Sequence, residues 1–233
     1  MAINSWSHSR LGDFEKCKFL CWLKHDQKIP EPERTLRPGQ TEHANDRGSR
    51  IHDSAERYVR GEVNLIPELK SFAPEFPRLR ELFKHGSVSL EGEWGMDRNW
   101  EPAPWKTAWH RSKLDALVHL SPKEAVVIDY KSGKRYGNEI KHGEQTQLYA
   151  LNTALRYPLL EKITTELWYT DVDELYRVVY TRDQALRFRA SWDKRGNAMT
   201  SCEDWPANPN VFSCKWCPYG PWGTDHCKVG VQR

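Results

Sequence analysis

The sequence predicts a single α/β domain, built from a central β-sheet flanked by helices. Three apolar or alternating segments, at residues 88–96, 111–120 and 125–130, follow one another as strands. Segments with helical spacing precede and follow these strands, and a strand hairpin comes later, at residues 163–181. The 233 residues suffice for one substantial domain, so residues 1–233 are expected to form one unit.

The part of the chain before the strands is expected to be helical. A first helix starts at Ser9, whose hydroxyl is a good N-cap, and runs to about Lys24. Residues 30–41 are rich in Pro, Glu and Arg, and they predict a loop, which is a candidate gate for entry of a substrate. Two further helices, with apolar residues at helical spacing, are expected at residues 48–59 and 74–83.

The elements after the first strand are predicted in the same way. Residues 99–106 hold two Pro and two Trp and predict a loop. A helix at residues 143–156 ends before Pro158, since proline cannot continue a helix. Two alternating strands and a last helix before the Cys-rich tail are expected at residues 163–169, 175–181 and 183–199.

The net charge of +3 is too small for the whole chain to act as a polycation, so basic residues matter where they cluster. Two clusters are expected, one on the last helix and one around the turn after the third strand: Arg182, Arg187, Arg189, Lys194 and Arg195, and Lys131, Lys134, Arg135 and Lys141. Such clusters attract phosphate backbones in a salt-sensitive way. The alternative for the first is a solvated helix face, because Asp183 and Asp193 stand beside it.

The chain shows no sign of a membrane or secretory segment. No apolar run comes near the roughly 20 residues that a membrane span needs, so no membrane partner is expected. The N-terminal residues Met1 to Trp6 hold no basic region followed by an apolar run, which excludes a secretory signal there. A cytoplasmic location is therefore expected.

Two of the expected strands carry an acid where an apolar residue is usual. These acids are Asp115, in the segment KLDAL, and Asp129, in the segment VVIDYKSGK. A buried carboxylate is costly unless it is paired or bound to a metal. Residues two apart in a strand share a face, so Asp129 lies with Lys131, and Asp115 joins them if the strands are neighbours. Two carboxylates and an ammonium suit a hard divalent cation and the phosphodiester that it activates. The alternative is a surface hairpin with an ion pair.

Two helices carry further candidate residues. His52 ends the segment GSRIH at the start of the second helix, and a neutral imidazole is an ordinary metal ligand. Gln145 and Tyr149 are four residues apart, so they lie on one face of a later helix. The alternatives are a solvated His, a solvated Gln and a Tyr packed in the core.

In chain order these residues give Gly-x-x-x-His, Asp, Asp-x-Lys and Gln-x-x-x-Tyr. This succession resembles the RecB-like exonucleases of the PD-(D/E)xK nuclease superfamily. The resemblance implies a restriction-endonuclease-like core, with a mixed central β-sheet flanked by helices. It also implies a divalent metal, Mg²⁺ or Mn²⁺, held by His52, Asp115, Asp129 and the carbonyl of Tyr130.

The resemblance implies roles for the neighbouring residues as well. Lys131 orients the attacking water or neutralises charge on the phosphate, Gln145 positions the nucleophile or the substrate, and Tyr149 supports Gln145 or meets DNA. The family often has one more acid on the preceding strand. Glu93 is preferred there because it lies nearer the strand end than Glu91, which shares its face. A solvated strand face is the alternative.

The cysteines form a separate group of candidates. Of the 6 Cys, three follow one another as C-x2-C and C-x9-C at Cys214, Cys217 and Cys227. This is metal-ligand spacing, but three thiolates are one short of the usual four. Cys17 is the candidate for the fourth ligand, Cys21 is the reserve, and Cys202 is expected to be a lone thiol.

This arrangement resembles the iron–sulfur subgroup of RecB-like nucleases, which includes the CRISPR-adaptation and AddB types. The opening SHSRLGDFEKC, ending at Cys17, looks like the Ser-x-Ser-x-Leu…Phe…Cys opening of that subgroup. The resemblance implies a 4Fe–4S cluster that staples residues 1–24 to the C-terminal Cys-rich segment, residues 202–233. Four-thiolate Zn²⁺ is the alternative, because zinc accepts the same ligands. Disulfides rank last, since they need an oxidising compartment.

The implied function is that of a metal-dependent DNA nuclease that hydrolyses phosphodiester bonds. The length fits a stand-alone exonuclease of the kind found in phages and in CRISPR adaptation, with DNA as its partner and 5′→3′ polarity favoured. Two alternatives stay open: a non-catalytic DNA-binding module that keeps the fold, and a zinc-stapled scaffold that binds protein. Intact Asp115, Asp129 and Lys131 argue against a decayed site.

Overall fold

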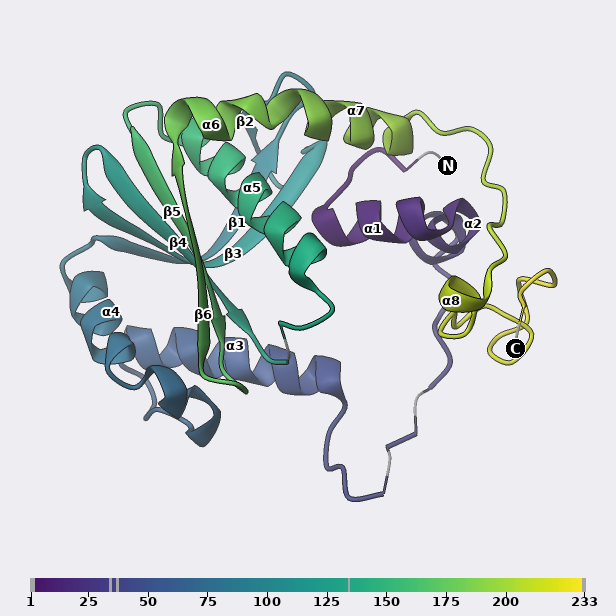
Figure 1. Cartoon of the computed structure of the whole chain (residues 1–233), viewed down its shortest axis with the longest axis horizontal. Coiled ribbons are helices and arrows are strands. Elements are labelled where there is room, and N and C mark those ends of the chain that lie inside the picture. The colour runs from purple at the N-terminus through teal and green to yellow at the C-terminus, as the bar shows by residue number, and fades with distance from the viewer. Residues whose placement is uncertain (1–2, 34, 37, 134, 232–233) are drawn as a thin grey trace.

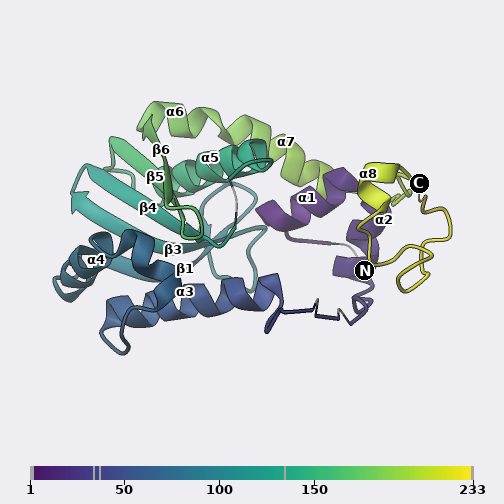
Figure 2. The same ribbon diagram turned by 60° about the horizontal axis from the view of Figure 1, so that its bottom comes forward.

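A six-stranded mixed sheet lies between two layers of helices (Figures 1 and 2). The structure is a computed structural model, which describes residues 3–33, 35–36, 38–133 and 135–231. The strand order is β2-β1-β3-β4-β5-β6, and the strands span Val88–Met96 (β1), Pro102–Ala103 (β2), His110–Ser121 (β3), Glu124–Lys131 (β4), Lys162–Tyr169 (β5) and Glu174–Thr181 (β6). The α/β fold with a mixed, helix-flanked sheet is therefore confirmed.

The pairing of the strands brings the two predicted acids together. β3 runs antiparallel to both β1 and β4, whereas β4 and β5 are parallel because a helix connects them. The β3–β4 ladder pairs Ala116 with Ile128. Asp115 and Asp129 are the next positions along these two strands, so their side chains leave the sheet side by side.

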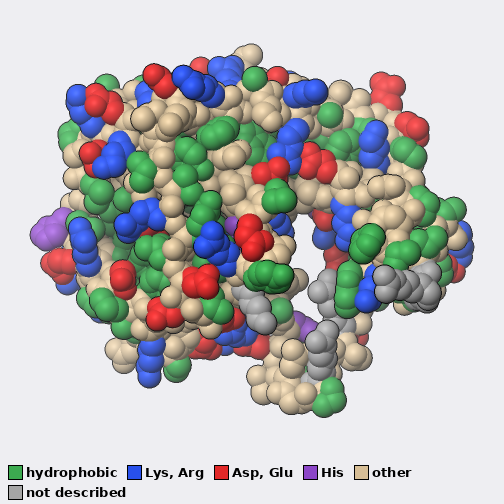
Figure 3. Space-filling view, in the orientation of Figure 1, with side chains coloured by type: hydrophobic (Ala, Val, Ile, Leu, Met, Phe, Trp, Pro, Cys, Tyr) green, Lys and Arg blue, Asp and Glu red, His purple; other side chains and the backbone are tan. Residues whose placement is uncertain are grey.

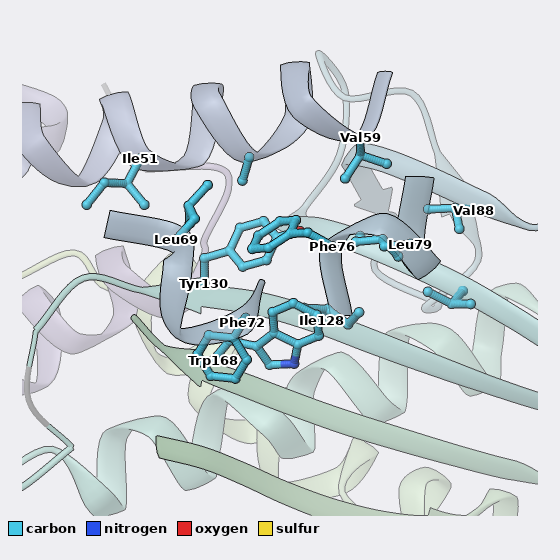
Figure 4. Packing of buried hydrophobic residues seen from close by; sticks show 13 residues of the cluster. Ile51, Val59, Leu69, Phe72, Phe76, Leu79, Val88, Ile128, Tyr130 and Trp168 are labelled. Carbon is cyan, nitrogen blue, oxygen red and sulfur yellow. The ribbon is translucent and has the colours of Figure 1, made fainter. Parts of the chain in front are cut away.

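One face of the sheet is covered by α3 (Ala44–Arg60), the 3₁₀ helix η2 (Pro67–Phe72) and α4 (Glu75–Lys84). α3 is amphipathic, and it places Ile51, Ala55 and Val59 against the sheet. Figure 4 shows this core, in which Phe72 stacks on Trp168 and Phe76 lies beside Tyr130. This core packs α3 against β3 and β4, and it thereby positions His52 next to these two strands.

The opposite face carries α5 (Glu139–Arg156), α6 (Arg182–Arg187) and α7 (Arg189–Thr200) (Figure 2). Its core includes aliphatic residues of β3 and β4 packed against α5, among them Leu117, Val127, Ala150 and Ala154. α5 follows β4, the strand that carries Asp129, and leads to β5. The start of α5 therefore lies next to the end of that strand, where Asp129 and Lys131 are.

The N-terminal helices are joined to the sheet by a cluster of tryptophans. α1 (His8–Lys16), α2 (Lys18–Cys21) and the π-helix η1 (Trp22–Asp26) follow Trp6, which is fully buried. Trp6 packs edge-on against Trp100 and Trp109 and stacks on Trp192 of α7. A Cβ atom at Gly196 would come within 2.4 Å of the Trp6 ring, so only glycine fits there.

Several element boundaries differ from those predicted. The first helix starts with Ser7 as its N-cap, not Ser9, and it does not run unbroken to Lys24. Cys17 interrupts it with extended backbone, and beyond the break Phe19 N–H donates to the carbonyl of Pro206 at 3.3 Å. Tertiary contacts with the C-terminal segment thus replace helical hydrogen bonds. The last predicted helix is likewise divided into α6 and α7 at Phe188.

Short elements escaped prediction altogether. The predicted loop at residues 99–106 contains the two-residue strand β2, and the tail contains the four-residue helix α8 (Val211–Cys214). The helices around the site are longer than predicted, since α3 and α5 begin at Ala44 and Glu139. Elements of two to four residues carry too few positions for a periodic pattern to reveal them.

Candidate active site

Asp115, in the middle of β3, is buried, and each of its two carboxylate oxygens has one hydrogen-bond partner. Its Oδ2 accepts the backbone N–H of Tyr130 at 2.5 Å, and its Oδ1 lies 2.7 Å from His52 Nδ1. Burial and the nearby charge of Asp129 raise the pKa of Asp115, while the His52 contact opposes the shift. Any positive charge added nearby would therefore stabilise the ionised form of this carboxylate.

Asp129, near the end of β4, is 5% exposed. Its Oδ1 accepts the Tyr149 hydroxyl at 2.5 Å and the Gln145 amide at 3.4 Å. Its Oδ2 lies 2.5 Å from Lys131 Nζ, but it accepts no hydrogen bond of regular geometry from the residues that the structure describes. A buried carboxylate oxygen in this condition has a lone pair left for a cation.

His52 and Glu91 complete a group of metal-ligating atoms with Asp115. One atom of each side chain lies within 4.8 Å of the other two, and this is the only such trio among the residues described. Burial alone would lower the pKa of His52, but the hydrogen bond to Asp115 and the charges of Asp115 and Asp129 outweigh it and raise that pKa. Burial and the Asp115 charge raise the pKa of Glu91.

The structure brings Glu91, and not the preferred Glu93, to this group. Glu91 has a φ of +47° and stands opposite Asp115, between the ladder pairs Leu90–Ala116 and Gly92–Leu114. Glu93 instead forms an ion pair with Lys113 at 2.9 Å, and both side chains are about half exposed or more. The sequence shows that the two acids share a face, but choosing between them requires the strand register, which no local pattern encodes.

Gln145 and Tyr149 lie on the same face of α5, as their spacing predicts. Gln145 Nε2 donates to the Tyr149 hydroxyl at 2.7 Å, and both groups reach Asp129 Oδ1. Tyr149 is only 3% exposed, and its hydroxyl is engaged by Asp129 and Gln145, so little of its surface faces the cleft. Tyr130 turns its ring into the core, and its backbone N–H fixes Asp115.

These residues line an open cleft with an acidic half and a basic half. The acidic half, about 500 Å³, holds the trio and Asp129. The basic half, about 390 Å³, shares Lys113, Gln145 and Tyr149 with it and adds Lys131, Lys141, Arg111, His8 and His142. Burial, followed by nearby lysines, lowers the pKa of His142 to about 4. The basic half therefore gains its charge from Lys and Arg, while this histidine stays neutral at pH 7.

The two predicted basic clusters have different surroundings, and only the second contributes to the cleft. On the last helices, Arg182 donates to the carbonyl of Ala154 and Arg195 pairs with Glu15 and Glu144, so these side chains brace the fold. Around the turn after β4, Lys131 and Lys141 face the basic half of the cleft. Lys134 lies outside the described residues.

The four predicted ligand cysteines line one cavity at the far end of the molecule. Cys17, Cys214, Cys217 and Cys227 surround it together with the buried ring of Tyr219. Cys21 is buried elsewhere, against the tryptophan cluster, where burial raises its pKa to about 12. Cys202 points its thiol at the carbonyl of Asp204 and is not part of the cavity.

The spacing of these thiols limits what they can bind. Within the described part of the chain, no three of their sulfur atoms lie within 4.8 Å of one another. A single tetrahedral Zn²⁺, with Zn–S bonds of about 2.3 Å, would hold its sulfurs roughly 3.8 Å apart. In the structure these sulfurs are therefore not gathered as closely as one bound zinc ion would hold them. The six cysteines are all free thiols in the structure.

The fold is consistent with the PD-(D/E)XK nucleases, and sequence comparison assigns the chain to them. The sequence profile of the PD-(D/E)XK nuclease superfamily matches residues 5–120 and 111–222. The chain belongs to this superfamily, whose members use divalent metals. Among curated proteins no match is found.

Solved exonuclease structures are similar to this chain. A candidate exonuclease from Eubacterium rectale shares 12% identity over 99% of this chain and 90% of its own, with a TM-score of 0.54. An alkaline exonuclease from Laribacter hongkongensis shares 15% identity over 86% of this chain and 88% of its own, with a TM-score of 0.34. The first likeness supports the common fold, whereas a TM-score of 0.34 is too low to bear on it. No helix in the described residues is long and apolar enough to cross a membrane.

Proposed function

We propose that the protein is a Mg²⁺- or Mn²⁺-dependent deoxyribonuclease that hydrolyses phosphodiester bonds from DNA ends. The observation that carries this proposal is the trio of His52, Glu91 and Asp115, gathered within 4.8 Å beside the buried Asp129. Two oxygen donors and an imidazole suit Mg²⁺ or Mn²⁺ better than a softer metal. The Oδ2 atom of Asp129 and the carbonyl of Tyr130 are the further candidate donors.

The residues around this group each have a separate task. A bound divalent ion supplies an activated water and a polarised phosphate. Lys131, whose Nζ lies at the boundary between the two halves of the cleft, neutralises charge that grows on the phosphate during attack. Gln145 and Tyr149 hold Asp129 in one rotamer through their hydrogen bonds. The lysines of the basic half attract the DNA backbone.

The assignment of the strand-β1 acid passes from Glu93 to Glu91. Glu93 is engaged by Lys113, and its side chain is about half exposed. Glu91, by contrast, is partly buried and shares the trio with Asp115. Glu91 is therefore the proposed ligand, and Glu93 is the matched control carboxylate on the same strand face.

The Cys-lined cavity is proposed to hold a 4Fe–4S cluster that staples residues 1–24 to residues 202–233. The resemblance to the iron–sulfur subgroup ranks a cluster above a single Zn²⁺, which accepts the same four thiolates. Cys17, Cys214, Cys217 and Cys227 are the four ligands of this proposal. The test is anaerobic purification followed by metal analysis. About four Fe per chain and a brown colour support the cluster, whereas one Zn per chain and no colour refute it.

The nuclease proposal is tested by incubating the purified protein with linear and covalently closed circular DNA, with Mn²⁺ and with EDTA. Degradation of linear DNA that depends on Mn²⁺, with circles left intact, is the expected result. End-labelled substrates give the polarity, for which 5′→3′ is the favoured direction. Binding without cleavage, under every metal condition, would support a non-catalytic DNA-binding module instead.

A further inference from the structure

One tryptophan lines the cleft instead of packing into a core. Most of the 11 tryptophans belong to the hydrophobic clusters of the molecule. Among the described residues, Trp105, Trp216 and Trp222 are the tryptophans outside these clusters, and Trp105 is the one that lines the basic half of the cleft. Its side chain is partly exposed, so part of a large aromatic surface is open to a ligand at this place.

The ring belongs to the same continuous cleft as the candidate metal site. Trp105 shares the basic half with His8 of α1 and Gln145 of α5. Figure 3 shows the molecule hollowed beside the start of α5, on the side of the N-terminal helices. Because Gln145 also reaches Asp129, a ligand on the ring would lie next to the catalytic group.

The loop that carries Trp105 is held on both sides. Before the ring, β2 pairs with β1, and a Cβ atom at Gly95 would come within 2.5 Å of the Ala103 carbonyl oxygen, so the loop lies close against β1. After the ring, the guanidinium of Arg111 donates to the carbonyl of Lys106 at 3.0 Å. A ring on a loop fixed in this way loses little conformational freedom when a ligand stacks on it.

Two cations of β3 lie against the ring. Arg111 Cζ is 5.4 Å and Lys113 Nζ is 5.8 Å from the centroid of Trp105. Residues two apart in a strand share a face, so both cations approach the ring from one side and leave its other side to the cleft. This combination matches a nucleotide, because a base stacks on an aromatic face and its phosphates pair with Arg and Lys.

Strand β3 also sets the distance between the ring and the candidate metal site. Lys113 lines both halves of the cleft, and Asp115 follows two residues further along the strand. At about 3.4 Å per residue, Lys113 and Arg111 lie roughly 7 and 14 Å from Asp115 along β3. A base stacked on Trp105 would therefore belong to a nucleotide close to the phosphate that is cut.

We propose that Trp105 is a stacking platform for one unpaired nucleobase of the DNA strand that is cut. This inference rests on the proposed nuclease function. Every base has a face that can stack, so the site accepts any sequence. The fused rings of a purine overlap an indole more than the single ring of a pyrimidine does. The cleft should therefore prefer a purine at one position near the cut.

The first test measures binding without catalysis. Single-stranded DNA with an abasic site at successive positions is bound to the Asp129→Asn variant. An abasic site at one position should weaken binding by about 5–150-fold, the usual loss for one base stacked on an aromatic ring. With Trp105→Ala added, intact DNA should bind as weakly, and the abasic site should have no further effect. This cycle isolates the contact between ring and base.

Two matched variants in the same background complete the cycle. Trp105→Phe keeps an aromatic ring and should retain most of the sensitivity to the abasic site. Trp216→Ala removes an exposed tryptophan outside the cleft and should retain all of it. A position-specific loss that persists in Trp105→Ala, no sensitivity at any position, or no binding at all would overturn the proposal. Uniform weakening by Trp105→Ala, with the abasic effect intact, would also overturn it, because the ring would then only support Arg111 and Lys113.

The second test measures cleavage with Mn²⁺. The wild-type protein should cut strands with a purine at the sensitive position faster than strands with a pyrimidine there, and Trp105→Ala should cut both at one rate. The same preference in both proteins would contradict the stacking platform. Failure of the wild-type protein to cut any DNA would instead refute the nuclease function, while the binding cycle still decides whether Trp105 stacks on a base.

Discussion

The catalytic cleft and the cysteine cavity are stabilised in different ways. Around the cleft, Asp115 and Asp129 are fixed by strand pairing, by the Tyr130 N–H and by the hydroxyl of Tyr149, above an aromatic core. Among the described residues, the hydrophobic cluster beside the cysteines has three buried members, Leu20, Leu23 and Tyr219, and Cys214 and Cys227 are buried as well. The lobe around the cysteines leaves Phe212 and Trp216 exposed at 85% and 70%.

The difference predicts how each site would depend on the metal that is proposed for it. The carboxylates of the cleft are held by the sheet, so the fold does not need the ion in order to form. The cysteine lobe buries too little apolar surface to stabilise itself, as in small domains that depend on metals. Loss of metal should therefore cost the cleft its activity and the lobe its structure.

The largest effect on stability is expected for Cys17→Ser. A cluster between residues 17 and 227 closes nearly the whole chain into one loop, and a crosslink of that span is worth about 5 kcal/mol in unfolding free energy if it acts as a disulfide would. The variant should lose iron and solubility together. Denaturant unfolding and iron analysis measure the two effects.

Cys202→Ser is the matched control, because its thiol lies outside the cavity. It should keep both iron and stability. The buried Cys21 gives a second control with a different outcome, since Cys21→Ser should lose some packing in the tryptophan cluster but keep its iron. Iron retained in Cys17→Ser and lost in Cys21→Ser would show that the other turn of the helix supplies the ligand.

The largest effect on activity is expected for substitutions of Asp129 and Lys131 on β4. Asp129→Asn removes a ligand charge with little change of shape, and Lys131→Ala removes the cation beside it. Each should lower the cleavage rate by at least about 10²–10³-fold, the usual cost of losing one charge-stabilising group. Circular dichroism should show the native fold in both. Near-normal cleavage by Asp129→Asn would contradict the proposed site.

A smaller effect distinguishes the two acids of β1. Glu91→Gln should weaken Mn²⁺ binding by about 10–100-fold, if this residue ligates or directly supports the metal. Glu93→Gln changes an equivalent carboxylate that is paired with Lys113, and it should leave Mn²⁺ affinity unchanged. Isothermal titration calorimetry measures both. The opposite ranking would return the assignment to Glu93.

The sequence predicts most of the fold because its strands and helices carry clear periodic patterns. It also predicts that Asp129 shares a face with Lys131 and that Gln145 lies with Tyr149, since both relations follow from spacing within one element. The choice of Glu91 could not be predicted. It depends on the β1–β3 register and on a positive φ at Glu91, which are decided by long-range packing.

Long-range contacts also explain the missed helix break at Cys17. The residues from Ser9 to Lys24 satisfy helical spacing locally, yet Cys17 Sγ accepts the backbone N–H of Asn208 at 3.3 Å and the chain turns there. A partner 191 residues away in sequence leaves no local signal. The resemblance to the iron–sulfur subgroup implies that Cys17 meets the C-terminal cysteines, but it does not predict the backbone geometry that brings them together.

The most direct test of the metal site is a crystal structure of the protein soaked with Mn²⁺, analysed by anomalous scattering. We expect one strong peak within coordination distance of His52, Glu91 and Asp115, with Asp129 adjacent. The same soak of Glu91→Gln should weaken that peak, and Glu93→Gln should leave it unchanged. A well-ordered crystal with Mn²⁺ bound elsewhere and none at this trio would contradict the assignment.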